Sequence, residues 1–186
     1  MATFGSADIM LGATDDISRI QLFDGPLEIG WHHCAMTADF VGELFAIRVG
    51  EASPDYREIR HSIGYLVNEL IENAVKFRAP GIIAVEAAMR DGTFRVKVSN
   101  QVDRDTAARF QGLILEITDG DPGDLLIRRI EANAADPTYS GSGLGLLTLM
   151  SDYGARLAWV FNPSADGSRV FIETHAILPV VAPVAH

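Results

Sequence analysis

A helix-length apolar pattern followed at once by two β-rich runs constrains the fold of this chain more than any other feature. Apolar residues recur at helical spacing from Tyr56 to Phe77, and Pro80-Gly81 ends the helix that this pattern predicts. Residues 82–88 and 93–99 are rich in β-forming residues, and Asp91-Gly92 between them is a strong hairpin signal. A helix that leads into a hairpin favours a sheet with helices packed on it.

The remaining segments continue this alternation. The predicted elements are, in chain order, a strand within residues 17–29, a helix over 31–49, two helical pieces within 103–140, a helix over 144–153, and paired strands at 156–161 and 168–176. They predict an α/β fold, a two-layer α/β sandwich with a mixed, mainly antiparallel sheet and helices on one face. One domain would span 17–178, with 17–55 as an N-terminal strand and helix extension, between a flexible lead-in at 1–16 and a tail at 179–186.

The composition is that of an acidic globular protein, with 48% hydrophobic residues, a formal net charge of −10 and a pI near 4.8. A negative surface repels phosphodiester backbones, so we expect no nucleic-acid partner, although a local cationic pocket for one nucleotide is compatible with it. No apolar run is long enough to span a bilayer and the N-terminus lacks a signal-peptide pattern, so we expect no membrane association and a cytoplasmic location.

Cys34 is the single cysteine, which excludes an intramolecular disulfide.

Within the long predicted helix, Glu69, Asn73 and Lys76 follow at i, i+4 and i+7 and share one stripe. A carboxylate that can orient or deprotonate a hydroxyl, one turn from an amide oxygen that can ligate Mg²⁺, is a usable pair for phosphoryl transfer. Lys76 could meet phosphate charge at the end of the stripe. The alternative interpretation is a solvated polar face with a Glu72–Lys76 ion pair.

A second segment, made of Gly141, Ser142, Gly143, Leu144 and Gly145, has the composition of an anion-binding turn. Glycines let the backbone approach an anion closely, and a helix that begins near Leu144 would point its N–H groups at it. The spacing is not that of a Walker A loop, because no Lys-Ser/Thr follows, and no clear strand precedes it as a Rossmann turn requires.

Together the two segments resemble the GHKL superfamily of histidine-kinase-like ATPases, which includes histidine kinases, type II topoisomerase and chaperone ATPases, and bacterial anti-sigma serine kinases. Glu69-x-x-x-Asn73-Ala-x-Lys-Phe77 is similar to its N box, and Gly141-Ser-Gly-Leu-Gly-Leu146 to its G2 box. Residues 166–171 resemble the strand that closes the nucleotide pocket. The three segments fall in family order, and the resemblance covers residues 56–178.

The resemblance implies ATP and Mg²⁺ as cofactors. By position, Asn73 would bind Mg²⁺, Glu69 would be the catalytic residue that orients or activates the attacking group, and Ser168 would lie near the adenine. The glycines of the second segment would cradle the phosphates under a mobile lid.

One box departs from the family pattern. The G1 box, Asp-x-Gly-x-Gly, should follow the strand at 93–98, where this chain reads Asn100-Gln-Val-Asp-Arg104. Asn100 can still accept a hydrogen bond from the adenine amino group, but it brings no charge, and losing such a bond costs about 1–3 kcal/mol. The missing glycines would also crowd the loop beneath the base, which puts ATP binding in question.

Glutamate at position 69 distinguishes the chain from classical histidine kinases, which usually carry asparagine there, and no phosphoacceptor helix pair precedes the domain. His61 is read as a structural or surface residue. The chain thus resembles stand-alone anti-sigma and SiaB-type serine kinases of partner-switching systems, which phosphorylate a small antagonist protein. Two alternatives stay open: a catalytically degenerate module that binds or sequesters a regulator, and a detached histidine-kinase catalytic domain.

Three further patterns have simpler interpretations. His32-His33 beside Cys34 is read as structural, because adjacent histidines point around a helix rather than at one metal. The aspartates of residues 119–124 indicate a turn with a helix cap. Trp31, Phe40 and Phe45 are read as packing residues, although the helix over 31–49 offers a surface for a homodimer or another partner.

Overall fold

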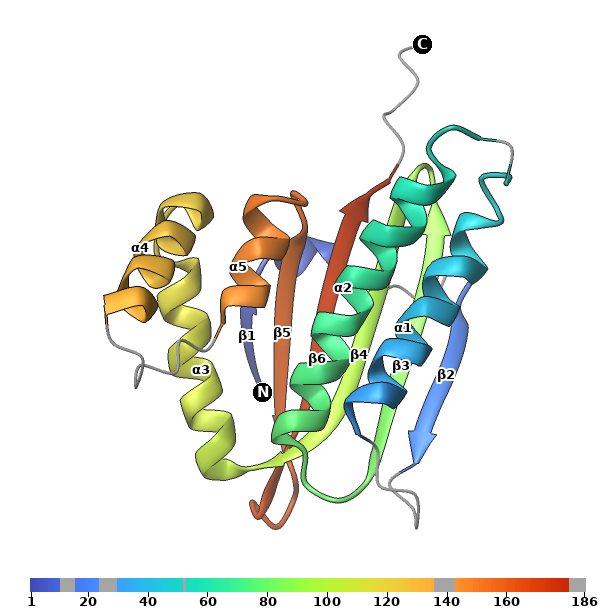
Figure 1. Cartoon of the computed structure of the whole chain (residues 1–186). Helices are drawn as coiled ribbons and strands as arrows, with labels where there is room; N and C mark the ends of the chain where they lie inside the picture. The colour runs from blue at the N-terminus through green and yellow to red at the C-terminus, as the bar shows by residue number, and fades with distance from the viewer. Residues whose placement is uncertain (11–15, 24–29, 52, 136–142, 181–186) are drawn as a thin grey trace.

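The long helix forms as α2 (Tyr56–Phe77), and its buried face is made by Ile59, Ile63, Leu66 and Leu70 at the spacing that the sequence shows. We describe it from a computed structural model (Figure 1) that covers residues 1–10, 16–23, 30–51, 53–135 and 143–180. Like the other helices of these ranges, α2 is not both long and apolar enough to cross a membrane.

The other predicted elements also form, and η1 and β1, which were not predicted, precede them. The helices are η1 (Ala7–Ile9), α1 (Trp31–Ala46), α3 (Arg104–Thr118), α4 (Pro122–Ala135) and α5 (Leu144–Ser151). The strands are β1 (Ala2–Gly5), β2 (Ser18–Phe23), β3 (Ile82–Arg90), β4 (Thr93–Asp103), β5 (Arg156–Pro163) and β6 (Arg169–Pro179). The two predicted hairpins are β3–β4 and β5–β6.

One six-stranded sheet in the order β1-β5-β6-β4-β3-β2 forms the second layer, and α1 to α5 cover one of its faces (Figure 1). Every neighbouring pair of these strands is antiparallel. β5 runs in the same direction as β4, but β6 lies between them, so no parallel pair results. The fold is the two-layer α/β sandwich that the sequence predicts.

The two faces of the sheet differ in chemistry because side chains alternate along each strand. Towards the helices, β4 buries Phe94, Val96 and Val98, and the Phe94 ring meets Phe45 of α1 edge-on at 5.0 Å. On the opposite face, Glu86 of β3 pairs with Arg19 of β2 and with Lys97 of β4. Each of these charged residues lies opposite its partner in the strand register.

Both ends of the chain differ from the sequence prediction. Instead of a flexible lead-in, residues 2–5 form β1 on the edge of the sheet, and Ile9 is buried. The physical reason is tertiary: Phe4 packs edge-on against Phe161 of β5 at 5.6 Å, a contact that local sequence does not reveal. At the other end Pro179, assigned to the tail, ends β6, and residues 181–186 lie outside the described ranges.

α1 and α2 approach each other closely at a glycine. A Cβ atom on Gly42 of α1 would lie 2.7 Å from the Arg60 carbonyl oxygen of α2 and 3.3 Å from the Gly64 amide nitrogen. Both neighbours are backbone atoms, which cannot rotate away, so the helix spacing depends on the missing side chain.

We therefore expect Gly42→Ala to destabilise the protein by about 1–3 kcal/mol, because the added methyl group overpacks the helix contact. Gly112→Ala is the matched control: Gly112 is exposed on α3 with open space around its Cβ position, so alanine should stabilise the helix by about 0.5–1 kcal/mol. Chemical denaturation followed by circular dichroism measures both. Equal stabilisation by the two substitutions would contradict the proposed helix contact.

Candidate functional site

The polar stripe of α2 faces α5, the helix that follows the glycine-rich turn. Tyr65, Glu69 and Asn73 lie one turn apart on this side. Tyr65 stacks on Tyr153, just beyond α5, with ring centroids 5.0 Å apart and ring planes at 16°. Asn73 Nδ2 donates a 2.8 Å hydrogen bond to the Glu69 backbone carbonyl, which leaves the Asn73 amide oxygen to accept or to ligate a cation.

Glu69 lies directly against the first turn of α5. A Cβ atom on Gly145 would be 1.7 Å from Glu69 Oε2 and 2.6 Å from Glu69 Cδ, so the carboxylate occupies the space that a side chain would fill. Burial, and then the charge of Glu72, raise the pKa of the Glu69 carboxyl above its ordinary value. A half-buried carboxyl with a raised pKa suits proton transfer to or from a hydroxyl near neutral pH.

The turn before α5 also depends on a glycine. Gly143 is the residue before the helix and has a φ of +91°, a conformation that favours glycine. A Cβ atom here would lie 3.0 Å from Leu113 Cδ1 of α3, so the turn packs tightly under that helix. Leu144 begins α5. Gly141 and Ser142 lie outside the described residues, so their role in phosphate binding stays a prediction.

Asn100, the residue at the altered G1 position, lies against α2 beside this stripe. Its side chain is 6% exposed, and its Nδ2 donates a 3.4 Å hydrogen bond to the Ala74 carbonyl, one residue beyond Asn73. The bond fixes which end of the amide faces the helix backbone. The Asn100 amide oxygen is the atom left to accept a hydrogen bond from a ligand.

A pocket between α2, α3 and the sheet is lined by both Asn73 and Asn100. Its lining residues are Leu70, Asn73, Ala74, Phe77, Asn100, Val102, Thr106, Phe110, Leu146, Trp159, Ile172 and Thr174. Most of these side chains are apolar, and a few polar groups converge among them, which is the usual lining of a small-molecule site. This lining is chemically suited to a flat heterocyclic base, but the enclosed space of about 20 Å³ is smaller than a base, so the pocket would have to widen to hold one.

Sequence reasoning missed the contribution of α3 to this pocket. Thr106 and Phe110 lie one turn apart on the same side as buried Ile114, so helical phase was the signal that could have found them. Asp103 fixes the start of the helix by accepting hydrogen bonds from the Thr106 amide at 2.7 Å and from its hydroxyl at 2.9 Å. These bonds lower the pKa of the Asp103 carboxyl.

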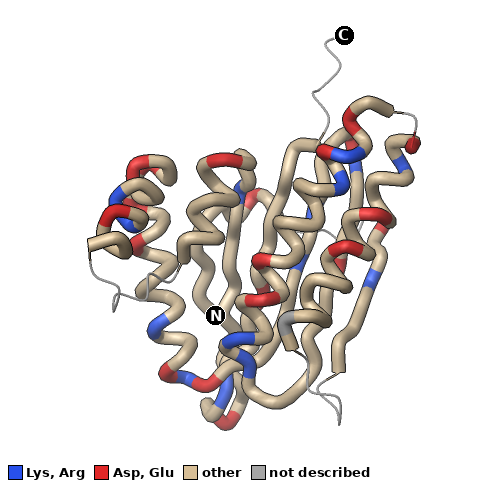
Figure 2. The backbone as a smooth tube through the Cα atoms, in the orientation of Figure 1, with Lys and Arg blue, Asp and Glu red and all other residues tan. Residues whose placement is uncertain are grey.

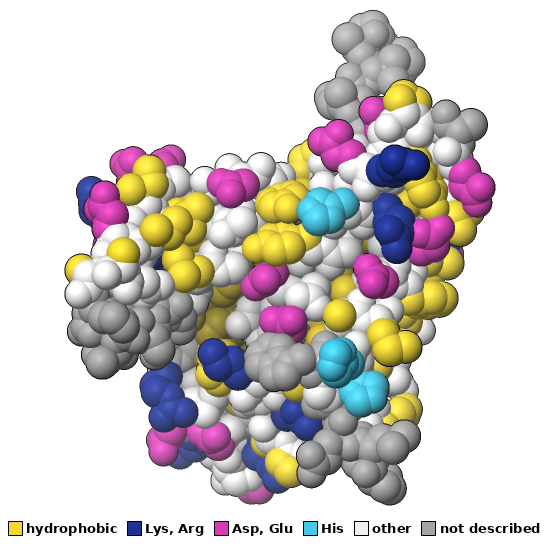
Figure 3. All heavy atoms as spheres, viewed as in Figure 1, with side chains coloured by type: hydrophobic (Ala, Val, Ile, Leu, Met, Phe, Trp, Pro, Cys, Tyr) yellow, Lys and Arg dark blue, Asp and Glu magenta, His cyan; other side chains and the backbone are white. Residues whose placement is uncertain are grey.

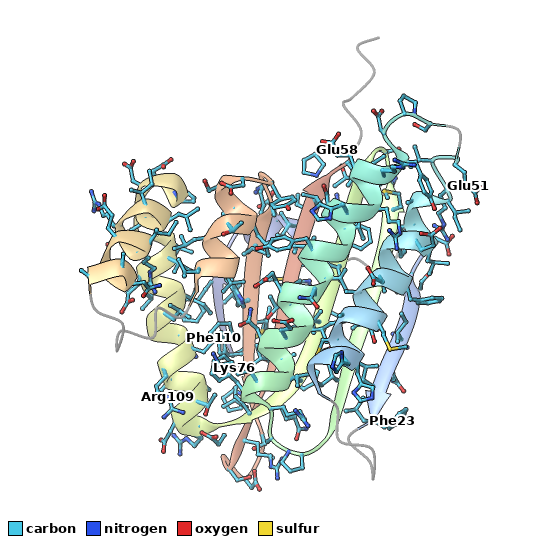
Figure 4. All side chains as sticks on the ribbon, viewed as in Figure 1. Phe23, Glu51, Glu58, Lys76, Arg109 and Phe110 are labelled. Atoms are coloured by element: carbon cyan, nitrogen blue, oxygen red, sulfur yellow. The ribbon has the colours of Figure 1, made fainter. Side chains whose placement is uncertain are left out.

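Several Lys and Arg residues lie at the end of the molecule where α2 ends and α3 begins, interleaved with Asp residues (Figure 2). Figure 4 shows Lys76 on α2 facing Phe110 and Arg109 on α3. The Lys76 ammonium lies 5.1 Å from the centroid of the Phe77 ring, and Arg109 donates a 2.9 Å hydrogen bond to the Thr106 hydroxyl. Lys76 and Arg109 are thus two cations beside the pocket, and Arg109 was not predicted.

Ser168 is the described candidate that the structure leaves apart from this cluster. It lies in the turn between β5 and β6, where its hydroxyl donates a 2.8 Å hydrogen bond to Asp166. Hydrogen bonds from Ser164 and Ser168 lower the pKa of Asp166 to about 2. The Ser168 hydroxyl is therefore engaged in the turn, and Thr174 of β6 lines the pocket instead.

The structure shows the surroundings of the residues that the sequence analysis read as structural or as a helix cap. His33 Nδ1 accepts a 3.0 Å hydrogen bond from the Gly30 amide at the start of α1, and Cys34 is fully buried in the core. Asp121 accepts hydrogen bonds from two backbone amides at the start of α4, as predicted for a helix cap. Across the described ranges, no group of three or more His, Cys, Asp or Glu side chains could hold a metal ion.

The N-terminal helix α1 corrects one prediction. Phe45 is buried as expected, but Phe40 is 57% exposed, because its helical phase turns it away from both the sheet and α2. Met36 and Ile47 share that side of α1 and are also exposed. Figure 3 shows hydrophobic side chains on this part of the surface. A homodimer or partner contact here stays a prediction.

Comparison with known proteins identifies the fold and nothing finer. No family model matches the sequence, and no curated protein matches it. Among solved structures, the chain is similar to a chain in the crystal structure of the SiaB–SiaC complex from Pseudomonas aeruginosa, with a TM-score of 0.58 and 20% sequence identity. The match covers 87% of this chain and 89% of the other. At this identity the likeness shows a shared fold.

The raised pKa of Glu69 predicts a pH-dependent stability difference. Since folding raises this pKa above its ordinary value of 4.5, ionising the carboxyl costs stability, and the cost is present at pH 7 and disappears as the pH falls below 4.5. Glu69→Gln cannot ionise, so we expect it to be more stable than wild type at pH 7 and to lose this advantage by pH 4. Urea denaturation at several pH values measures the difference.

Glu131→Gln, an exposed change on α4 that alters the net charge equally, is the control. Its stability difference from wild type should not change between pH 7 and pH 4 as that of Glu69→Gln does. A Glu69→Gln difference that stays constant between pH 4 and pH 7 would contradict the buried-carboxyl interpretation.

Proposed function

We propose that this chain is an ATP- and Mg²⁺-dependent protein serine/threonine kinase of the partner-switching type. The observation that carries the proposal is the placement of the Glu69 carboxylate against Gly145, with Asn73 one turn further along α2. This placement joins the predicted N box to the described part of the glycine-rich turn, as the resemblance to GHKL kinases requires. Asn100 lines the neighbouring pocket, and Lys76 and Arg109 lie close to it, where they would meet the charge of a triphosphate.

Each residue has a role that its surroundings support. The amide oxygen of Asn73 would ligate Mg²⁺, whose other ligands would be phosphate oxygens and water. Bound MgATP supplies the transferable phosphoryl group and much of the charge neutralisation. Lys76 and Arg109 would add positive charge, and the backbone amides at the start of α5 would bind phosphate oxygens.

Glu69 would act on the acceptor. As the bond between the acceptor oxygen and the γ-phosphorus forms, the bond from that phosphorus to the bridging oxygen of ADP breaks, and the hydroxyl proton passes to the Glu69 carboxylate. The raised pKa of Glu69 favours its taking up this proton. The same carboxylate then releases the proton to solvent.

The acceptor that we propose is a serine or threonine on a small regulatory protein. The similar solved chain comes from a complex of two proteins, SiaB and SiaC, and the shared fold supports an equivalent pairing for this chain in bacterial signalling. Leu115 of α3 and Ile127 and Ile130 of α4 are exposed apolar residues that precede the glycine-rich turn in sequence, and they offer contact area for such a protein.

A second candidate function has a specific observation in its favour. Asn100 replaces the charged aspartate of the family, and its amide nitrogen is committed to the Ala74 carbonyl. Phe110 also lines the pocket where a base would enter. A module that binds and sequesters a regulator without turning over ATP would be compatible with both.

Calorimetric titration with MgATP distinguishes the two. If the kinase proposal holds, Asn73→Ala should weaken binding by about tenfold or more, because it removes a metal ligand, while Asn68→Ala on the same helix should not. Asn100→Asp should bind more tightly, since a charged acceptor replaces a neutral one. It should also be less stable than wild type, because aspartate cannot donate to the Ala74 carbonyl. Equal affinity of wild type and Asn73→Ala would favour the sequestering module.

Phosphate transfer tests the catalytic step. Incubated with MgATP and a small regulatory protein that binds it, the wild-type chain should produce an acid-stable phosphoprotein, and Glu69→Gln should slow its formation about 100-fold or more. An acid-labile product would instead indicate phosphohistidine and a detached histidine-kinase domain. Tight partner binding without any transfer would sink the kinase proposal.

A further inference from the structure

The pocket contains a buried hydrogen-bond donor with no partner. Trp159 of β5 is fully buried, and its indole Nε1 has no hydrogen-bond acceptor among the described residues. Buried polar groups almost always find a partner, because leaving one unpaired costs about as much as the lost hydrogen bond. Trp159 is also among the residues that line the pocket, so its unpaired donor calls for an explanation.

Packing of the Trp159 ring does not by itself explain the unpaired N–H group. Trp159 lies opposite Thr174 of β6 in the strand register, with its ring among the residues that line the pocket. The ring of Phe110 meets it nearly at right angles, with centroids 6.4 Å apart. Phenylalanine would offer a similar apolar surface to Phe110 without burying an N–H group. The indole nitrogen is thus the feature that distinguishes tryptophan from phenylalanine at this position.

We propose that the indole N–H of Trp159 is the donor that recognises the base of the bound nucleotide. This inference rests on the proposed function and names a specificity-determining residue for it. Asn100 has an amide oxygen free to accept, and Trp159 has a hydrogen free to donate, and both side chains line the same pocket. Together they offer one acceptor and one donor.

Adenine presents the complementary pair. Its exocyclic amino group donates, and the ring nitrogens beside it, N1 and N7, accept. The amino group would bond to the Asn100 oxygen, and one of the two ring nitrogens would accept from Trp159. The donor on β5 thereby compensates for the charge that is missing at position 100, so the altered G1 position and the buried tryptophan form one recognition unit.

The first test removes either the donor of the proposed hydrogen bond, on Trp159, or its acceptor, a ring nitrogen of adenine. MgATP, its 7-deaza analogue and its 1-deaza analogue are titrated into wild type and Trp159→Phe. We expect one of the two analogues to bind wild type about 3- to 10-fold more weakly than MgATP, the fold-change that one neutral hydrogen bond produces. Trp159→Phe should bind MgATP more weakly by a similar factor and should not discriminate against that analogue.

The second test uses the wild-type protein alone and so does not depend on the variant folding. The chain has two tryptophans, Trp31 and Trp159, so its ¹H–¹⁵N spectrum should contain two indole signals, which Trp159→Phe assigns. Adding MgATP should move the Trp159 indole proton downfield and slow its exchange with solvent. The deaza analogue that lacks the acceptor should leave this proton near its unbound position.

The outcomes separate the inference from the function on which it rests. If MgATP binds but both analogues bind equally well and the Trp159 indole signal does not move, Trp159 is a packing residue and the inference is wrong, while the proposed function stands. If MgATP does not bind at all, the proposed function and the inference fail together. Discrimination between analogues that persists in Trp159→Phe would assign recognition to another residue.

Discussion

The contact between the Glu69 carboxylate and Gly145 joins the two parts of the molecule to which we assign the proposed chemistry, α2 and the start of α5. Because position 145 has no side chain, α5 can approach α2 until the carboxylate fills the space that a Cβ atom would take. The same approach brings Tyr65 onto Tyr153, where the two rings stack. A larger residue at 145 would have to displace the carboxylate from this position, and the geometry on which the proposed phosphoryl transfer depends would be lost.

The sheet supports this contact because its two faces carry different kinds of side chain. The face under the helices is apolar and continuous, so α2 is fixed along its whole buried side by Ile59, Ile63 and Leu66. The opposite face carries the Arg19–Glu86–Lys97 pairs across three strands. On the helix side a few polar groups, such as Asn100, reach into apolar surroundings. That is where a base-sized ligand gains most from hydrogen bonds, because water does not compete.

Much of the fold could be predicted from the sequence because its signals are local. The helical period of α2, the proline that follows it and the Asp-Gly turn of the β3–β4 hairpin each depend on a few neighbouring residues. The same holds for the stripe of Glu69, Asn73 and Lys76. β1 was missed because its stability comes from Phe161, more than 150 residues away in the chain. The exposure of Phe40 was missed because helical phase alone does not say which side of α1 the rest of the protein covers.

By itself, then, the sequence determined the order of helices and strands, the polar stripe on α2 and the altered residue at position 100, since each is a matter of residue type and spacing. Only the tertiary structure decided what these residues face. Packing of α3 onto the sheet brought Thr106 and Phe110 to the pocket, and strand pairing set Trp159 beside it with an unpaired N–H. The physical reason is that a hydrogen bond or a close contact depends on distances between elements, which are fixed when the core packs and not by any local pattern.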